Sequence, residues 1–167
     1  TYIGWYAAYY QQVGGNNVAI GHQTLYGASG KANSASENVA IGYQSAYGSD
    51  VGTGLTAVGS RALRNVSDSG SYSTAIGYYA GFHASGSYNT FVGADAGKGG
   101  TTSAPFSSGT NNVAIGYQAL TGFTTGGTNV AVGYQAGRVV TTATNNTLVG
   151  PYAGYDLTTG TGNTLIG

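Results

Sequence analysis

Short stretches that alternate between β-branched and other residues recur along the whole chain, and each of them ends on a glycine. The residue before this glycine is isoleucine or valine in every copy, and the residue two places earlier is valine or threonine. Alternation with period two and β-branched residues is typical of a short strand with one buried face. The motif glycines are Gly4, Gly21, Gly42, Gly59, Gly77, Gly93, Gly116, Gly133, Gly150 and Gly167.

The spacing of these glycines predicts the fold class. Successive glycines are separated by 17, 21, 17, 18, 16, 23, 17, 17 and 17 residues. Periods near this length indicate a solenoid, in which each repeat buries its apolar face only by stacking on its neighbours. We therefore expect an all-β fold: a parallel β-solenoid (β-roll) of about ten short coils of roughly 17 residues, with 1–167 as a single repetitive segment. With strands about 4.8 Å apart, the rod would be on the order of 45 Å long.

Each position of the repeat carries its own expectation. The residue before the glycine is expected to form the structural core: Ile20, Ile41, Val58, Ile76, Val92, Ile115, Val132 and Val149. The residue before that one is mostly alanine, which indicates a second packing surface, between chains. A small residue three places after each glycine predicts a second short strand beyond a sharp corner. Asparagine opens most of the first strands and predicts a hydrogen-bonded ladder along the rod.

Composition excludes several partners. Only ten of the 167 residues are charged, the formal net charge is zero, and there is no cysteine. Without a basic patch we expect no nucleic-acid partner, and without a long apolar run we expect no membrane insertion in this segment. Because the chain starts with Thr1 inside a repeat and stops on a motif glycine, we expect it to be an excerpt of a longer fibre chain.

The residues that carry catalytic chemistry are scattered singly over separate repeats. His22 and His83 lie in different coils, and no carboxylate pair recurs at a fixed offset. Catalysis needs polar groups that converge on one point, so we expect no enzyme and neither a cofactor nor a metal site. His22 stands where most other copies carry an aromatic residue, directly after the motif glycine.

Function is sought at the surface of the rod. The aromatic column after the glycines is either a structural stack or an exposed platform for sugar rings. The two longest intervals add loop at 27–37 and 99–110, and insertions in solenoids often lie on the binding face. Two sequons make Asn65 and Asn145 candidate glycosylation sites. The candidate surface contacts are Tyr43, Tyr78, Tyr117, Tyr134, Pro105 and Phe106.

Two phrases carry a family resemblance. Residues 112–120 (NVAIGYQAL) and 38–44 (NVAIGYQ) resemble the head repeats of trimeric autotransporter adhesins, the YadA-like left-handed parallel β-roll, and are similar to repeats of phage tail fibres. The resemblance implies a homotrimer displayed on a cell or virion surface. This chain has a longer and less regular period than the adhesin heads, and its Tyr-Gln after the glycine favours a tail fibre or a similar shaft.

The leading interpretation is a structural and adhesive fibre segment, a rigid shaft of an extracellular or virion appendage that attaches to a surface glycan or receptor. One alternative is a self-assembling, glycosylated extracellular filament, in which terminal coils stack end to end into a homopolymer. Another is a carbohydrate-binding or ice-binding solenoid. Ice binding predicts a regular Thr-x-Thr array, whereas the threonines here alternate irregularly with valine.

Overall fold

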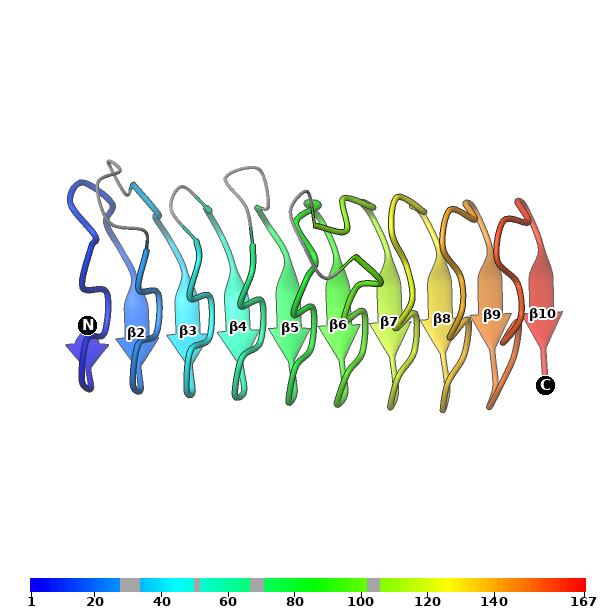
Figure 1. The fold of residues 1–167 in the computed structure, drawn as a ribbon, viewed down its shortest axis with the longest axis horizontal. Coiled ribbons are helices and arrows are strands. Elements are labelled where there is room, and N and C mark those ends of the chain that lie inside the picture. The colour runs from blue at the N-terminus through cyan, green and yellow to red at the C-terminus, as the bar shows by residue number, and fades with distance from the viewer. Residues whose placement is uncertain (28–33, 50–51, 67–70, 102–105) are drawn as a thin grey trace.

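The chain folds as a rod of stacked coils (Figure 1). The computed structural model describes residues 1–27, 34–49, 52–66, 71–101 and 106–167, and these form one parallel ten-stranded sheet in chain order, with no helix in the described part. The expected all-β solenoid is confirmed. The strands are β1 (Tyr2–Ile3), β2 (Val18–Ile20), β3 (Val39–Ile41), β4 (Thr56–Val58), β5 (Thr74–Ile76), β6 (Thr90–Val92), β7 (Val113–Ile115), β8 (Val130–Val132), β9 (Thr147–Val149) and β10 (Thr164–Ile166).

Equivalent residues of successive coils lie side by side. Ala19 pairs with Ala40 between β2 and β3, and the same register continues along the sheet. Hydrogen bonds between coils extend beyond the strands. Gly42 N donates to Ile20 O at 2.9 Å, and Gln44 N donates to the His22 carbonyl oxygen at 3.0 Å. Each side chain therefore has its equivalents about 4.8 Å away on either side, which builds columns along the rod.

The strands bury the opposite face from the one expected. Ala75 and Ala114, the middle residues of β5 and β7, are fully buried, whereas Ile76 and Ile115 are 42% and 40% exposed. The prediction that the residue before the glycine forms the core is wrong for the single chain: Ile20, Ile41, Val58, Ile76, Val92, Ile115, Val132 and Val149 are all half-buried or exposed. The interior of so thin a coil has room for small side chains on the strand, so the branched residues lie outside.

Small residues also line the facing wall of the interior. The position three places after the glycine is buried, as at Ser45, Ala62 and Ala119. The larger apolar side chains fill the remaining space in individual coils, and they include Phe91 and Leu120. The core is therefore a narrow column of alanines with a few large residues inserted.

The segment after each motif glycine is a turn and contains no second strand. In the third coil Gln44 has φ 52° and Ala46 has φ 49°, so every second residue adopts the left-handed conformation. This alternation reverses the chain within a few residues, where a strand would extend it, and the prediction of a second strand is wrong. The motif glycine itself is required: a Cβ on Gly116 (φ 127°) would lie 2.5 Å from the Gly133 carbonyl oxygen.

The expected asparagine ladder is confirmed. Asn129 donates from both its backbone N and its Nδ2 to Asn112 Oδ1, each at 3.1 Å. Asn112 N donates in the same way to Asn89 Oδ1 at 2.8 Å. Asn129 Nδ2 also reaches the carbonyl of Ala143 at 2.8 Å. These side chains are buried, and they satisfy backbone groups at the start of the strands that asparagine opens.

Candidate functional surfaces

The first surface is the outer strand face, which we define as the first and last residues of β2 to β10. It contains only valine, isoleucine and threonine, and it runs the length of the sheet without a charged residue. Its residues are half-buried or exposed in the single chain. A continuous exposed apolar surface of this kind marks an interaction site in most soluble proteins.

The second surface is the outer aromatic column, which we define as the residues directly after the motif glycines. Its tyrosines, the candidate contacts Tyr43, Tyr78, Tyr117 and Tyr134, are all exposed. His22 stacks on Tyr43 with ring centroids 5.5 Å apart and 15° between planes, so it does replace an aromatic residue. Tyr117 and Tyr134 stack at 5.5 Å and 23°. Where rings stack in this way, they cover each other's faces and leave mainly edges toward solvent.

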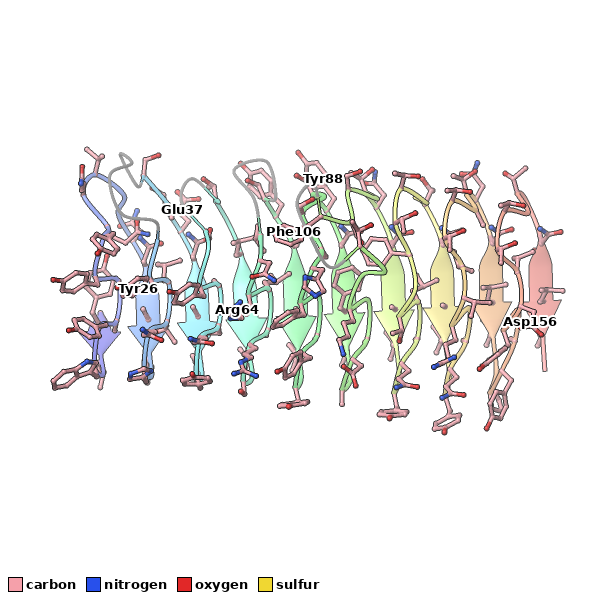
Figure 2. All side chains as sticks on the ribbon, viewed as in Figure 1. Tyr26, Glu37, Arg64, Tyr88, Phe106 and Asp156 are labelled. Atoms are coloured by element: carbon pink, nitrogen blue, oxygen red, sulfur yellow. The ribbon has the colours of Figure 1, made fainter. Side chains whose placement is uncertain are left out.

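The third feature is the second aromatic column, formed by Tyr9, Tyr26, Tyr47, Arg64 and Phe82; Tyr26 and Arg64 are labelled in Figure 2. Tyr26 stacks on Tyr9 at 5.8 Å and on Tyr47 at 5.0 Å, with planes within 11° and 3°. The Arg64 guanidinium continues the column, with Cζ 4.9 Å from the Tyr47 centroid and 5.6 Å from that of Phe82. Burial of the phenol raises the pKa of Tyr26 to about 12, so its hydroxyl stays protonated.

A ladder of glutamine side chains runs beside the aromatic columns. Gln44 Nε2 donates to Gln23 Oε1 at 2.8 Å, and Gln135 Nε2 to Gln118 Oε1 at 2.7 Å. Arg64 Nε donates to Gln44 Oε1 at 3.0 Å. The sequence analysis missed both the ladder and the role of this arginine. Glutamine recurs at the second place after the motif glycine, and that column was the signal for the ladder.

The long insertion at 99–110 is attached to the rod through His83. The buried ring of His83 stacks on Phe106 at 5.5 Å and 24°, so this candidate contact packs against the rod; Pro105 lies outside the described residues. Asn65 Nδ2 lies 3.0 Å from His83 Nδ1, and because an amide NH₂ only donates, Nδ1 accepts. Burial, together with two nearby cations, lowers the pKa of His83 and favours the neutral ring.

The two sequons differ in accessibility. Asn65 is engaged on both sides of its amide, because Oδ1 accepts from Arg64 Nη1 at 3.0 Å while Nδ2 donates to His83. Asn145 is exposed and has φ 59° in the loop before β9. A glycan on Asn65 would disrupt this hydrogen-bond network, whereas Asn145 can carry one without a change in packing.

The described part of the chain holds no group of three acidic or histidine side chains that could bind a metal ion, and no pocket is found there. Nor does it include a helix long and apolar enough to cross a membrane. Comparison with protein-family models, with curated proteins and with solved structures finds no match to this chain. Function must therefore be argued from the surfaces themselves.

Proposed function

We propose that this chain is a shaft segment of a homotrimeric fibre, displayed outside a cell or on a virion, that spaces and presents attachment surfaces. The observation that carries the proposal is the outer strand face, where Ile76 and Ile115 stay about two-fifths exposed in the single chain. The fold supports a structural role, because parallel coils joined by hydrogen bonds make a straight and stiff rod (Figure 1).

The partner that fits the outer strand face best is another copy of this chain. The face repeats with every coil, at the backbone spacing of about 4.8 Å. A second copy of this solenoid, aligned in parallel, presents a face with the same period. The face is uncharged, so no like charges oppose each other when copies meet. The number of chains in the proposed fibre, three, and its extracellular location rest on the resemblance to adhesin heads and tail fibres.

Burial of this face supplies apolar contact that the thin interior lacks. Alanine dominates the interior side of the strands. Burying the β-branched side chains on the outer side would stabilise the assembly by about 25 cal/mol for each Å² of apolar surface removed from water. One such residue contributes little, but the contribution recurs in every coil. Association would therefore stabilise each rod along its whole length.

The proposal is tested by placing charge on the face. We expect the double variant Ile76→Asp and Ile115→Asp to shift from trimer to monomer in size-exclusion chromatography with light scattering, because buried carboxylates without partners are strongly unfavourable. Thr142→Asp is the matched control: it adds charge on an exposed loop residue and should remain trimeric. If the double variant associates like the control, the outer strand face is not the interface.

A second candidate, an ice-binding solenoid, is favoured by one observation. The outer strand face is flat and faces outward, and it carries threonines such as Thr56, Thr74 and Thr90 at the first strand position. The array is irregular, because valine replaces threonine in about half of the strands. Measuring thermal hysteresis in a dilute solution of the chain distinguishes the ice-binding solenoid from the trimeric fibre. A face that is buried in a trimer cannot bind ice and produces no thermal hysteresis.

A further inference from the structure

We propose that the coil of Ala94 holds a binding site for one pyranose ring of a carbohydrate, between the side chains of Tyr78 and Tyr117. Ala94 interrupts the outer aromatic column: the coil before it carries Tyr78 at this position, and the coil after it carries Tyr117. This inference deepens the proposed function and rests on it for the role in attachment, because it names the class of ligand that the shaft binds.

Each of these tyrosines has a single ring contact among the described residues. Tyr117 stacks on Tyr134 with the face away from Ala94. Tyr78 leans on Tyr79, with centroids 4.3 Å apart and 58° between planes, and is 56% exposed. Within the described residues no ring contact joins Tyr78 to Tyr117. The coil of Ala94 lies between these two tyrosines and carries no ring at the equivalent position.

The width of this gap matches one sugar ring. Two coils correspond to about 10 Å along the rod. A ring in van der Waals contact with both tyrosines needs about 4 Å on each side, which one inserted ring satisfies. A puckered pyranose carries hydrogens on both faces and therefore contacts an aromatic ring on either side. The methyl group of Ala94 forms an apolar floor.

The interruption of the column at Ser60 is already filled. Ser60 stands between His22 and Tyr43 on one side and Tyr78 on the other, but Arg61 covers this coil. The Arg61 guanidinium lies 5.3 Å from the centroids of both Tyr43 and Tyr79, and it donates to the Tyr79 hydroxyl. The coil of Ala94 carries Asp95 at the position of Arg61, so no guanidinium covers it as one covers the coil of Ser60.

Polar groups for sugar hydroxyls lie at the edge of the gap. Asp95 stands where the following coils carry Gln118 and Gln135, so the glutamine ladder breaks in the same coil. Gln118 Oε1 accepts from Gln135 and Arg138, whereas its Nε2 has no acceptor among the described residues. Asp95 pairs with Lys98 through Oδ1 at 3.0 Å and offers its second oxygen as an acceptor. One donor and one acceptor suit adjacent hydroxyls of a neutral sugar.

The site is open to solvent on one side, which predicts weak binding by one copy. A single sugar sandwiched between two rings is expected to dissociate in the millimolar range, and a trimer with three such sites gains from multivalent attachment. The same coil carries the longest insertion, at 99–110, from which Phe106 packs on His83. The longest insertion, the missing aromatic residue and the break in the glutamine ladder therefore all belong to the coil of Ala94.

The test uses the intact chain on an array of immobilised neutral pyranose oligosaccharides, followed by titration of the best-bound one by saturation-transfer difference NMR. We expect Ala94→Tyr to complete the aromatic column, to keep or raise the melting temperature, and to weaken binding at least tenfold. Ser60→Tyr is the matched control, because it adds the same ring to the closed gap and should bind as the unmodified chain does.

Three results would overturn the site: no glycan on the array binds, Ala94→Tyr binds as tightly as the unmodified chain, or Ser60→Tyr loses binding to the same extent. The native mass of each variant keeps this test separate from the proposed function. A monomer that binds the sugar contradicts the trimer alone, and a trimer that binds no sugar contradicts the site alone.

Discussion

The ring of Phe91 occupies the space that a side chain on Gly97 would need, within the same coil of the rod. A Cβ on Gly81, in the coil before, would also lie only 2.9 Å from this ring. In coils with alanine at the strand position, the residue equivalent to Gly97 is often leucine, as at Leu63 and Leu120, and it is fully buried or nearly so. A large residue on the strand is thus matched by glycine on the facing wall.

This relationship predicts a compensating pair of substitutions. Phe91→Ala should destabilise the fold by about 3–5 kcal/mol because it leaves a cavity. Adding Gly97→Leu should recover most of this loss, since Leu63 and Leu120 adopt φ 48° and 49° at the equivalent position, close to the 54° of Gly97. Chemical denaturation followed by circular dichroism measures all three chains. A double variant no more stable than Phe91→Ala would show that the two walls do not compensate each other.

The asparagine ladder predicts a large effect for a small change. Asn112→Ala removes the acceptor of two Asn129 donors, and each unsatisfied buried group costs about 1–3 kcal/mol. We expect a loss of about 3 kcal/mol or more in the free energy of unfolding. Asn111→Gly is the neighbouring control, because Asn111 is exposed with φ 58°, a conformation that glycine adopts freely. Equal stability of the two variants would contradict the ladder as a stabilising element.

The pH dependence of stability should come in part from His83. Burial first, and then the charges of Lys98 and Arg64, lower its pKa below the usual 6.5. As the pH falls, His83 is protonated in the unfolded chain at a higher pH than in the folded chain. Its contribution to the free energy of unfolding is therefore complete above pH 6.5 and decreases as the pH falls toward the folded-state pKa. Melting temperatures from pH 8 to 5 should decline more in the unmodified chain than in His83→Gln.

His22→Gln provides the control for this experiment. His22 is exposed in the outer aromatic column, so its replacement should leave the decline unchanged. If His83→Gln shows the same slope as His22→Gln, the anchoring of Phe106 does not depend on a neutral imidazole.

The second aromatic column predicts an unusual order of tolerance at position 64. Arg64→Tyr should retain most of the stability, because a ring continues the stack between Tyr47 and Phe82. Arg64→Lys should lose about 1–2 kcal/mol, since lysine keeps the charge but cannot lie flat between the rings of Tyr47 and Phe82. Thermal unfolding ranks the variants, and a lysine variant more stable than the tyrosine variant would contradict the stack.

The sequence predicts the period, the strand positions and the asparagine ladder, because each depends on residues that recur in every coil. It does not predict which side of the strand is inside. Ala40 and Ile41 are both apolar and point to opposite faces, so the alternation alone does not say which of the two is buried. The pairing of Phe91 with Gly97, and of Leu148 with Gly154, was the signal that the middle strand residue faces the interior. The turn after the glycine was missed because Gln44 and Ala46 have no special preference for a left-handed conformation.

The surfaces were predicted only in part. The aromatic column after the glycines was visible in the sequence as a recurring tyrosine, and it stacks as one interpretation required. Its break at Ala94 was visible too, but the sequence alone does not show that Gln118 Nε2 in the next coil has no acceptor among the described residues. The packing of Phe106 on His83 joins residues far apart in the repeat numbering, and no spacing rule indicates it.

The central claim is that the outer strand face is buried between copies of this chain. Sedimentation equilibrium of the native chain over a range of concentrations tests it most directly. The chain has a mass of 16.7 kDa, and we predict a single species of three times that mass that persists on dilution. A species with the mass of one chain at every concentration would contradict the claim.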